Sequence, residues 1–202
     1  MESHSLPRLG RDLYQAHAVV HWTITLANRA RGWLDDGMHK DFRELLLHAS
    51  IRHHLVSPTY TLMPDHLHLI WMGLHPSSDQ LNGMRFLRTQ LQRLLTERGT
   101  PGKPFSLQKQ SHDHVLREDQ RRRGAFARAC SYVLANPMRA GLVGKPELWP
   151  WSGAILPGYP NLSPFEVDFW KVFWSAYERH RVEVDPATPR SPASSAGERS
   201  TG

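Results

Sequence analysis

Two histidines one residue apart lie in the segment Pro64-Asp65-His66-Leu67-His68-Leu69-Ile70. The apolar residues around them predict a strand, and a strand places residues two apart on the same face. His66 and His68 then project side by side, with Cα atoms roughly 7 Å apart, while the leucines between them face the core. Two neutral imidazoles at this spacing can bind one divalent metal ion. The alternative is a pair of surface histidines on a half-exposed strand.

A second set of reactive groups lies in Ser131-Tyr132-Val133-Leu134-Ala135-Asn136-Pro137. Tyr132 and Asn136 are four residues apart, so a helix places them on one face. The Tyr132 phenol can attack phosphorus and hold the product as a phosphotyrosine. The Asn136 amide oxygen is a hard ligand suited to Mg²⁺ or Mn²⁺. The alternative is a tyrosine in the core and an asparagine that closes the helix.

The two motifs occur in a fixed order along the chain. The first is followed by Tyr132-x-x-x-Asn136-Pro-Met-Arg-Ala-Gly-Leu-Val and then by Trp149-Pro150-Trp151-Ser152. In this combination the chain resembles the single-tyrosine HUH transposases of the IS200 type, and in particular the REP-associated tyrosine transposases. The resemblance extends over Val19 to Ser152.

The resemblance implies a metal-dependent DNA endonuclease and strand transferase with a ferredoxin-like fold. It implies His66 and His68 as metal ligands, Asn136 as the third ligand and Tyr132 as the nucleophile that forms a 5′-phosphotyrosine. The implied cofactor is Mg²⁺ or Mn²⁺. The implied partner is single-stranded, hairpin-forming DNA, bound by a monomer or a homodimer.

The hydrophobic pattern predicts the same fold class independently. Strands are expected over 18–26, 55–62, 66–72 and 112–117, and helices over 38–53, 81–94 and 120–136, with Pro137 ending the last of these. The order βαββαβα is that of an α+β ferredoxin-like sandwich, an antiparallel sheet with packed helices. A further C-terminal helix is predicted to begin at Ser163-Pro164-Phe165-Glu166, which has capping-box spacing. Its apolar stripe, Trp170, Phe173, Trp174 and Tyr177, is expected to dock on the core.

The chain carries a formal net charge of +6 and has a pI of about 9.8, which indicates a polyanionic partner. Most of the basic residues are arginines, which bind phosphate in a bidentate fork. The arginines expected to contact DNA are Arg85, Arg88, Arg121, Arg122, Arg123, Arg128 and Arg139.

The expected organisation is an N-terminal arm over 1–17, a catalytic domain over 18–152, a helical extension over 153–181 and a disordered tail over 182–202. The tail is rich in Pro, Ser, Ala and Gly and has no apolar period. Cys130 is the single cysteine, so no intrachain disulfide can form. Neither a membrane span nor a signal peptide is indicated, and a cytoplasmic, nucleoid-associated protein is expected.

Two other functional classes fit parts of these observations. A DNA-binding regulator at palindromic repeats would keep the fold without the chemistry. A metal-dependent hydrolase unrelated to DNA would use the histidines to activate water. Two other segments are weaker candidates: Cys130 is expected to be a small buried residue, and His112-Asp113-His114 to be a strand with its histidines facing solvent or DNA.

Overall fold

A computed structural model describes residues 9–99 and 104–182 of the 202-residue chain. Its helices and strands are η1 (Arg11–Tyr14), β1 (Val19–Thr25), η2 (Ala27–Arg29), α1 (Asp36–His53), β2 (Leu55–Met63), β3 (His66–Gly73), α2 (Gln80–Arg98), β4 (His112–Val115), α3 (Glu118–Arg122), α4 (Ala125–Arg139), η3 (Pro146–Leu148), β5 (Ser152–Ile155) and α5 (Phe169–His180). No helix in these ranges is long and apolar enough to cross a membrane.

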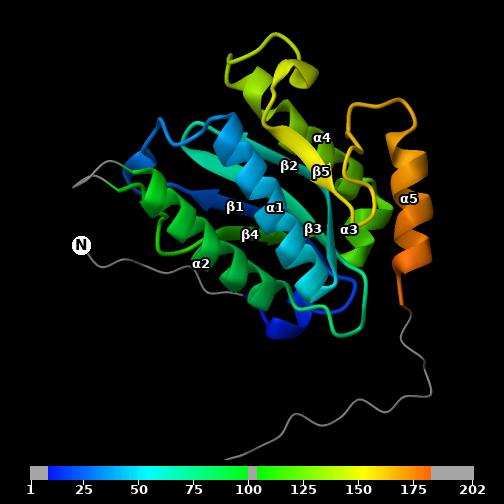
Figure 1. The fold of residues 1–202 in the computed structure, drawn as a ribbon. Helices are drawn as coiled ribbons and strands as arrows, with labels where there is room; N and C mark the ends of the chain where they lie inside the picture. Colours follow the sequence, from blue (N-terminus) through cyan, green and yellow to red (C-terminus); the bar gives the residue numbers. More distant parts are fainter. Residues whose placement is uncertain (1–8, 100–103, 183–202) are drawn as a thin grey trace, which may run out of the picture.

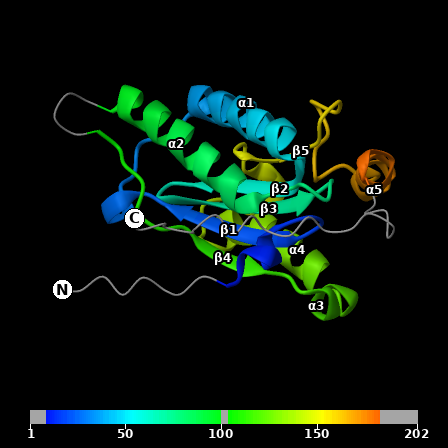
Figure 2. The same cartoon turned by 90° about the horizontal axis from the view of Figure 1, so that it is seen from below.

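The five strands form one antiparallel sheet in the order β4-β1-β3-β2-β5. The first four have the order of a ferredoxin-like sheet, so the predicted fold class is confirmed. Helices α1 and α2 cover one face of the sheet, and α3 and α4 lie on the other (Figures 1 and 2). Strand β5 was not predicted from the sequence. It adds an edge to the sheet beside β2.

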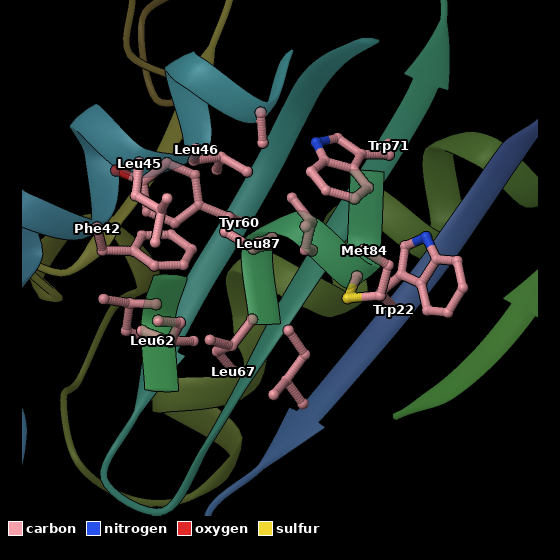
Figure 3. Packing of buried hydrophobic residues seen from close by; sticks show 14 of the residues in the cluster. Trp22, Phe42, Leu45, Leu46, Tyr60, Leu62, Leu67, Trp71, Met84 and Leu87 are labelled. Carbon is pink, nitrogen blue, oxygen red and sulfur yellow. The ribbon is translucent and has the colours of Figure 1, made fainter. Parts of the chain in front are cut away.

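Each face of the sheet has its own hydrophobic core because strand residues alternate between the faces. Under α1 and α2, Trp22 and Trp71 pack with Phe42 and Met84, all essentially inaccessible to solvent (Figure 3). The other face carries a second cluster that includes Val19, Ile70 and Met72 from the strands, Val133 from α4, and Phe169 and Phe173 from α5. Between these apolar residues the second face leaves room for polar side chains.

The N-terminal segment expected as an arm over 1–17 is partly built into the domain. Tyr14 in η1 is fully buried, contacts the Trp22 ring at 5.7 Å and donates a hydrogen bond to Asp113 of β4. Residues 1–8 of this segment and residues 183–202 of the expected tail lie outside the described residues.

The helix predicted over 120–136 is wrong at both ends. Gly124, with a φ of 77°, separates α3 from α4, a conformation that favours glycine. At the other end α4 continues through Pro137 to Arg139. Proline removes one N–H from the ladder, and here the Asn136 side-chain amide donates to the Val133 carbonyl instead, at 3.4 Å.

The C-terminal helix begins later than predicted. Residues Ser163 to Glu166 form turns in which the Ser163 hydroxyl accepts from the Phe165 amide at 3.4 Å, and α5 starts at Phe169. The buried stripe is therefore Phe169, Phe173, Ala176 and Tyr177. Trp170 and Trp174, expected in the docked stripe, remain 37% and 38% exposed.

Candidate active site

Two neighbouring strands place four polar side chains on the face of the sheet that carries α4. His66 and His68 alternate with the buried Leu67 and Leu69 along β3, as predicted. The register of the β1–β3 pairing places Thr23 opposite His68. His21, two residues earlier in β1, lies on the same face of the sheet, and its ring contacts that of His68 at 5.1 Å.

The two imidazoles of the motif converge on one point. The Nε2 atoms of His66 and His68 are 3.2 Å apart, and their ring planes are nearly perpendicular at 88°. On its other side, the His66 Nδ1 atom lies 2.7 Å from a carboxylate oxygen of Asp65. An Nδ1–H that donates to this carboxylate leaves the Nε2 atom of neutral His66 with a lone pair that faces His68.

The second histidine is held by β1. Its Nδ1 atom lies 3.1 Å from the His21 Nε2 atom and 3.1 Å from the Thr23 hydroxyl. These contacts set the orientation of the His68 ring. When Nδ1–H donates to them, the His68 Nε2 lone pair also points towards His66, and the two nitrogens can share a cation.

Burial holds two of these histidines in the neutral form. Desolvation, followed by the neighbouring His21 and His66, lowers the pKa of His68 to about 3. Desolvation, followed by His114, lowers the pKa of His21 to about 4. Neutral imidazole is the form that binds metal ions.

Tyr132 approaches the histidines from α4. Its ring centroid lies 5.8 Å from that of His68 and 6.0 Å from that of His21, both in edge-to-face contact. The side chain is 42% exposed, so a substrate can reach its hydroxyl from solvent. The Arg139 guanidinium lies over the same ring, 5.4 Å from its centroid. The structure therefore brings together Tyr132, His66 and His68, which are far apart in sequence.

Asn136 lies one helical turn after Tyr132, as predicted, and its amide is held by its own helix. Its side-chain nitrogen donates to the backbone carbonyls of Tyr132 at 2.8 Å and Val133 at 3.4 Å. The Oδ1 atom is thereby the end of the amide left for a ligand. Within the described ranges, no hydrogen bond connects Asn136 to His66 or His68.

The predicted arginines divide between the two faces of the sheet. Arg85 and Arg88 lie on α2, across the sheet from the histidines. Arg85 donates to the Asn82 side chain at 3.0 Å. Arg88 donates to the Ser111 hydroxyl at 2.8 Å and to the backbone carbonyls of Gln108 and Lys109. Arg88 therefore ties α2 to the segment before β4.

The remaining arginines lie on the α3–α4 side. Arg121 donates to the His17 carbonyl at 3.5 Å, and Arg128 donates to the Arg123 carbonyl at 2.8 Å. The side chain of Arg122 is outside the described structure. Of the predicted set, Arg139 is the one in contact with Tyr132.

Of the two weaker candidate sites, the β4 histidines lie beside this cluster, because His114 is opposite His21 and His112 is opposite Thr23 in the β1–β4 register. His112 and His114 are exposed on the edge strand β4, whereas Asp113 accepts the hydrogen bond from Tyr14. Cys130 is buried, and burial raises the pKa of its thiol to about 12.

Sequence reasoning missed the residues that support the histidine pair, His21, Thr23 and Asp65. Alternation in Val19–Thr25 separates His21 and Thr23 from the core residues Trp22 and Ile24, which indicates a shared polar face. The proximity of His21 and Thr23 to His68 depends on the pairing of two strands, because these residues are 47 and 45 positions away from His68 in the sequence.

Comparison with known proteins supports the resemblance that the sequence motifs indicate. No family model matches the chain. A REP-associated tyrosine transposase from Haemophilus influenzae is 26% identical over 147 residues, which are 66% of this chain and 78% of the relative. The resemblance to the REP-associated tyrosine transposases is confirmed. A solved structure of one such transposase, bound to a REP hairpin, superposes with a TM-score of 0.58 at 20% identity, covering 98% of this chain and 99% of that one. This superposition shows a shared fold.

The donor set fits the divalent ion implied by the resemblance to the REP-associated tyrosine transposases. Two nitrogens bonded to one metal at about 2.1 Å lie about 3.0 Å apart at a right angle and about 3.4 Å apart at a tetrahedral angle. The 3.2 Å between the His66 and His68 Nε2 atoms falls between these values. Across residues 9–99 and 104–182, no three His, Cys, Asp or Glu side chains form a group that could hold a metal. The role of Asn136 as the third ligand stays a prediction.

Proposed function

We propose that this protein cleaves single-stranded DNA and transfers the strand through a 5′-phosphotyrosine, in a metal-dependent reaction on hairpin-forming repeats. The observation that carries the proposal is the contact between Tyr132 and His68, whose Nε2 atom converges with that of His66. A nucleophile and a pair of imidazole nitrogen ligands thus share one partly open site. The hairpin in the related solved structure supports the choice of substrate.

In the proposed reaction the Tyr132 oxygen forms a bond to the scissile phosphorus, and the bond from phosphorus to the 3′ oxygen breaks. The phenol loses its proton to solvent, which its exposure permits, and the departing 3′ oxygen gains one. A 3′-hydroxyl then attacks the phosphotyrosine and restores both groups. No nucleotide cofactor is needed because the phosphodiester free energy is kept in the covalent intermediate.

His66, His68 and Asn136 would hold the divalent ion. A bound Mg²⁺ or Mn²⁺ would supply Lewis-acid stabilisation of the charge that develops on the phosphate oxygens. Asp65 orients the His66 ring, while His21 and Thr23 orient that of His68. These contacts keep both Nε2 atoms aimed at the metal position, next to the tyrosine.

Arg139 has a separate role in the proposed reaction. Its guanidinium lies beside the Tyr132 ring, and the phosphate must approach the same side chain in order to be attacked. A cation at this position attracts the substrate phosphate and offsets its charge. The net charge of +6 favours DNA binding more generally and predicts that affinity falls steeply with salt.

The test is formation of a covalent adduct. The full chain is incubated with end-labelled single-stranded hairpin DNA and Mn²⁺ or Mg²⁺, and the products are separated under denaturing conditions. We expect an adduct that requires metal and is absent from Tyr132→Phe and His66→Ala. Matched controls are Tyr159→Phe and His48→Ala, which change the same residue types away from the site, His48 being exposed on α1 across the sheet, and should retain the adduct.

The outcomes separate the proposal from its alternatives. Hairpin binding without an adduct in the wild-type protein would favour a DNA-binding regulator. A metal-dependent adduct that persists in Tyr132→Phe would refute the assignment of the nucleophile. Failure to bind DNA at any salt concentration would favour a hydrolase unrelated to DNA.

A further inference from the structure

A cavity of about 580 Å³ lies on the same face of the sheet as the candidate active site. Its aromatic wall is formed by Phe126 of α4 with Trp174 and Tyr177 of α5, and its polar wall by His17 and Arg121. The volume lies within the range of about 300–1,000 Å³ typical of small-molecule sites. The ends of β1 and β3, through Val19 and Met72, form its floor.

The His17 Nε2 and Arg121 Nε atoms at this cavity are buried and have no hydrogen-bond partner among the described residues. The His17 Nδ1 atom lies 3.3 Å from the Gly73 carbonyl, which also accepts from the Tyr177 hydroxyl at 3.0 Å. In neutral His17 this contact makes Nε2 an acceptor, and that atom is buried and unpartnered, as is the Nε–H donor of Arg121. Buried polar atoms in folded proteins are nearly always satisfied. A ligand that bears both an acceptor and a donor would satisfy these two atoms in place of water.

One side chain of the aromatic wall is only partly covered by the packing of α5. Helix α5 docks through Phe169, Phe173 and Tyr177, whereas Trp174 remains 38% exposed. The Trp174 ring leans on Phe126, with centroids 5.4 Å apart. An exposed indole at the mouth of a cavity offers a flat apolar surface on which a planar ring can stack.

The cavity and the active site are joined along two strands. Val19 of the cavity floor and His21 are two residues apart in β1, with His17 in the turn before this strand, and β3 carries His68 and Met72 four residues apart on this same face. Four residues of strand correspond to about 13 Å. This is about four stacked nucleotides at 3.4 Å for each base step. One DNA strand can thus contact Tyr132 and enter the cavity.

We propose that this cavity binds an unpaired nucleobase of the DNA strand cleaved at Tyr132; the inference rests on the proposed function. The base stacks on Trp174, accepts a hydrogen bond from Arg121 and donates one to His17 Nε2. The charged side chains of the lining balance, because Arg121 and Arg181 stand against Glu118 and Glu178, and Arg181 pairs with Glu178 at 3.9 Å, so the cavity favours a neutral group over a phosphate. A neutral planar group with donors and acceptors on one edge matches all of these features.

The test measures binding without chemistry. Fluorescence anisotropy in EDTA gives the Kd of the full chain for a labelled DNA hairpin with single-stranded flanks, and for the same DNA with an abasic site moved through each unpaired position. We expect one position at which the abasic site weakens wild-type binding by about five- to a hundredfold, the range for loss of a base–aromatic stack.

Protein variants then assign that position to the cavity. Trp174→Ala should weaken binding by a similar factor and should no longer respond to the abasic site at the sensitive position. Trp170→Ala is the comparison, since it removes a tryptophan of equal exposure that stacks on Trp174 at 6.3 Å but does not line the cavity, and it should keep the response to the abasic site. Arg121→Gln should reproduce the Trp174→Ala result, and thermal unfolding confirms that each variant is folded.

The proposal fails if no abasic position is selective, or if Trp170→Ala and Trp174→Ala respond equally to every abasic DNA. Because the binding assay contains no metal, its outcome is independent of the covalent-adduct assay. A covalent adduct without a selective abasic position would refute base binding in the cavity but not the strand-transfer activity. A selective abasic position without an adduct would refute the strand-transfer activity but not base binding in the cavity.

Discussion

The hydrogen bond between Asp65 and His66 sets a measurable part of the metal affinity in the proposed site. Burial by itself would raise the pKa of Asp65, but the His66 hydrogen bond and the charges of His66 and Arg29 outweigh it, and the pKa is lowered. The carboxylate is therefore ionised at neutral pH. It accepts from His66 Nδ1 at 2.7 Å, which holds the Nε2 lone pair towards His68 and raises its basicity.

The side chains of Asp65 and His66 are only 16% and 18% exposed, so solvent screens their contact weakly. A hydrogen bond to a charged group contributes about 1.5–3 kcal/mol and a neutral one about 0.5–1.5 kcal/mol. Asp65→Ala loses the whole contact, and we expect Mn²⁺ affinity to fall by about 10- to 100-fold. Asp65→Asn keeps a neutral acceptor, and we expect a loss of about tenfold.

Isothermal titration of Mn²⁺ into each protein measures these affinities directly. Asp41→Asn is the control, because it removes a carboxylate that pairs with Arg98 on the α1–α2 side of the sheet. That variant should bind like the wild type. Equal affinities in the wild type and both Asp65 variants would refute the orienting role, and a wild type that binds no Mn²⁺ would refute the metal site itself.

Two further predictions concern stability and are measured by urea unfolding. Gly73→Ala should destabilise the fold by about 3 kcal/mol or more, because a Cβ at this position would lie 1.7 Å from the Ala16 carbonyl oxygen. Gly144→Ala is the control: a Cβ there would have nothing within 4 Å, so stability should change by less than about 0.5 kcal/mol. Equal effects of the two substitutions would contradict the packing argument. Desolvation, followed by the charge of Arg43, lowers the pKa of His39 from 6.5 to about 4, so the unfolded chain binds this proton more readily than the folded protein. The contribution of His39 to the free energy of unfolding should therefore be constant above pH 6.5 and decrease between pH 6.5 and 4 by on the order of 1–2 kcal/mol. A His39→Gln variant with the same pH dependence as the wild type would show that this histidine is not responsible.

The helix predictions show where local patterns stop being sufficient. Pro137 was expected to end its helix, and the Asn136 side chain instead supplies the missing hydrogen bond, so α4 runs on to Arg139. Ser163 to Glu166 has the spacing of a capping box, yet those residues form turns before α5. In both cases the helix boundary differs from the one that local propensity predicts.

Local periodicity is enough to predict the fold class and the residues that share a face. Strand alternation alone puts His66 and His68 together, and helical spacing alone relates Tyr132 to Asn136, because both periodicities are properties of the local backbone. The pairing of β1 with β3 and the position of α4 on this face follow from the assembled fold. Those contacts join residues 45 or more positions apart, and they bring His21 to His68, Tyr132 to both histidines, and α5 over the aromatic cavity. Such long-range pairings depend on how all the apolar faces are buried at once, which no single segment of the sequence records.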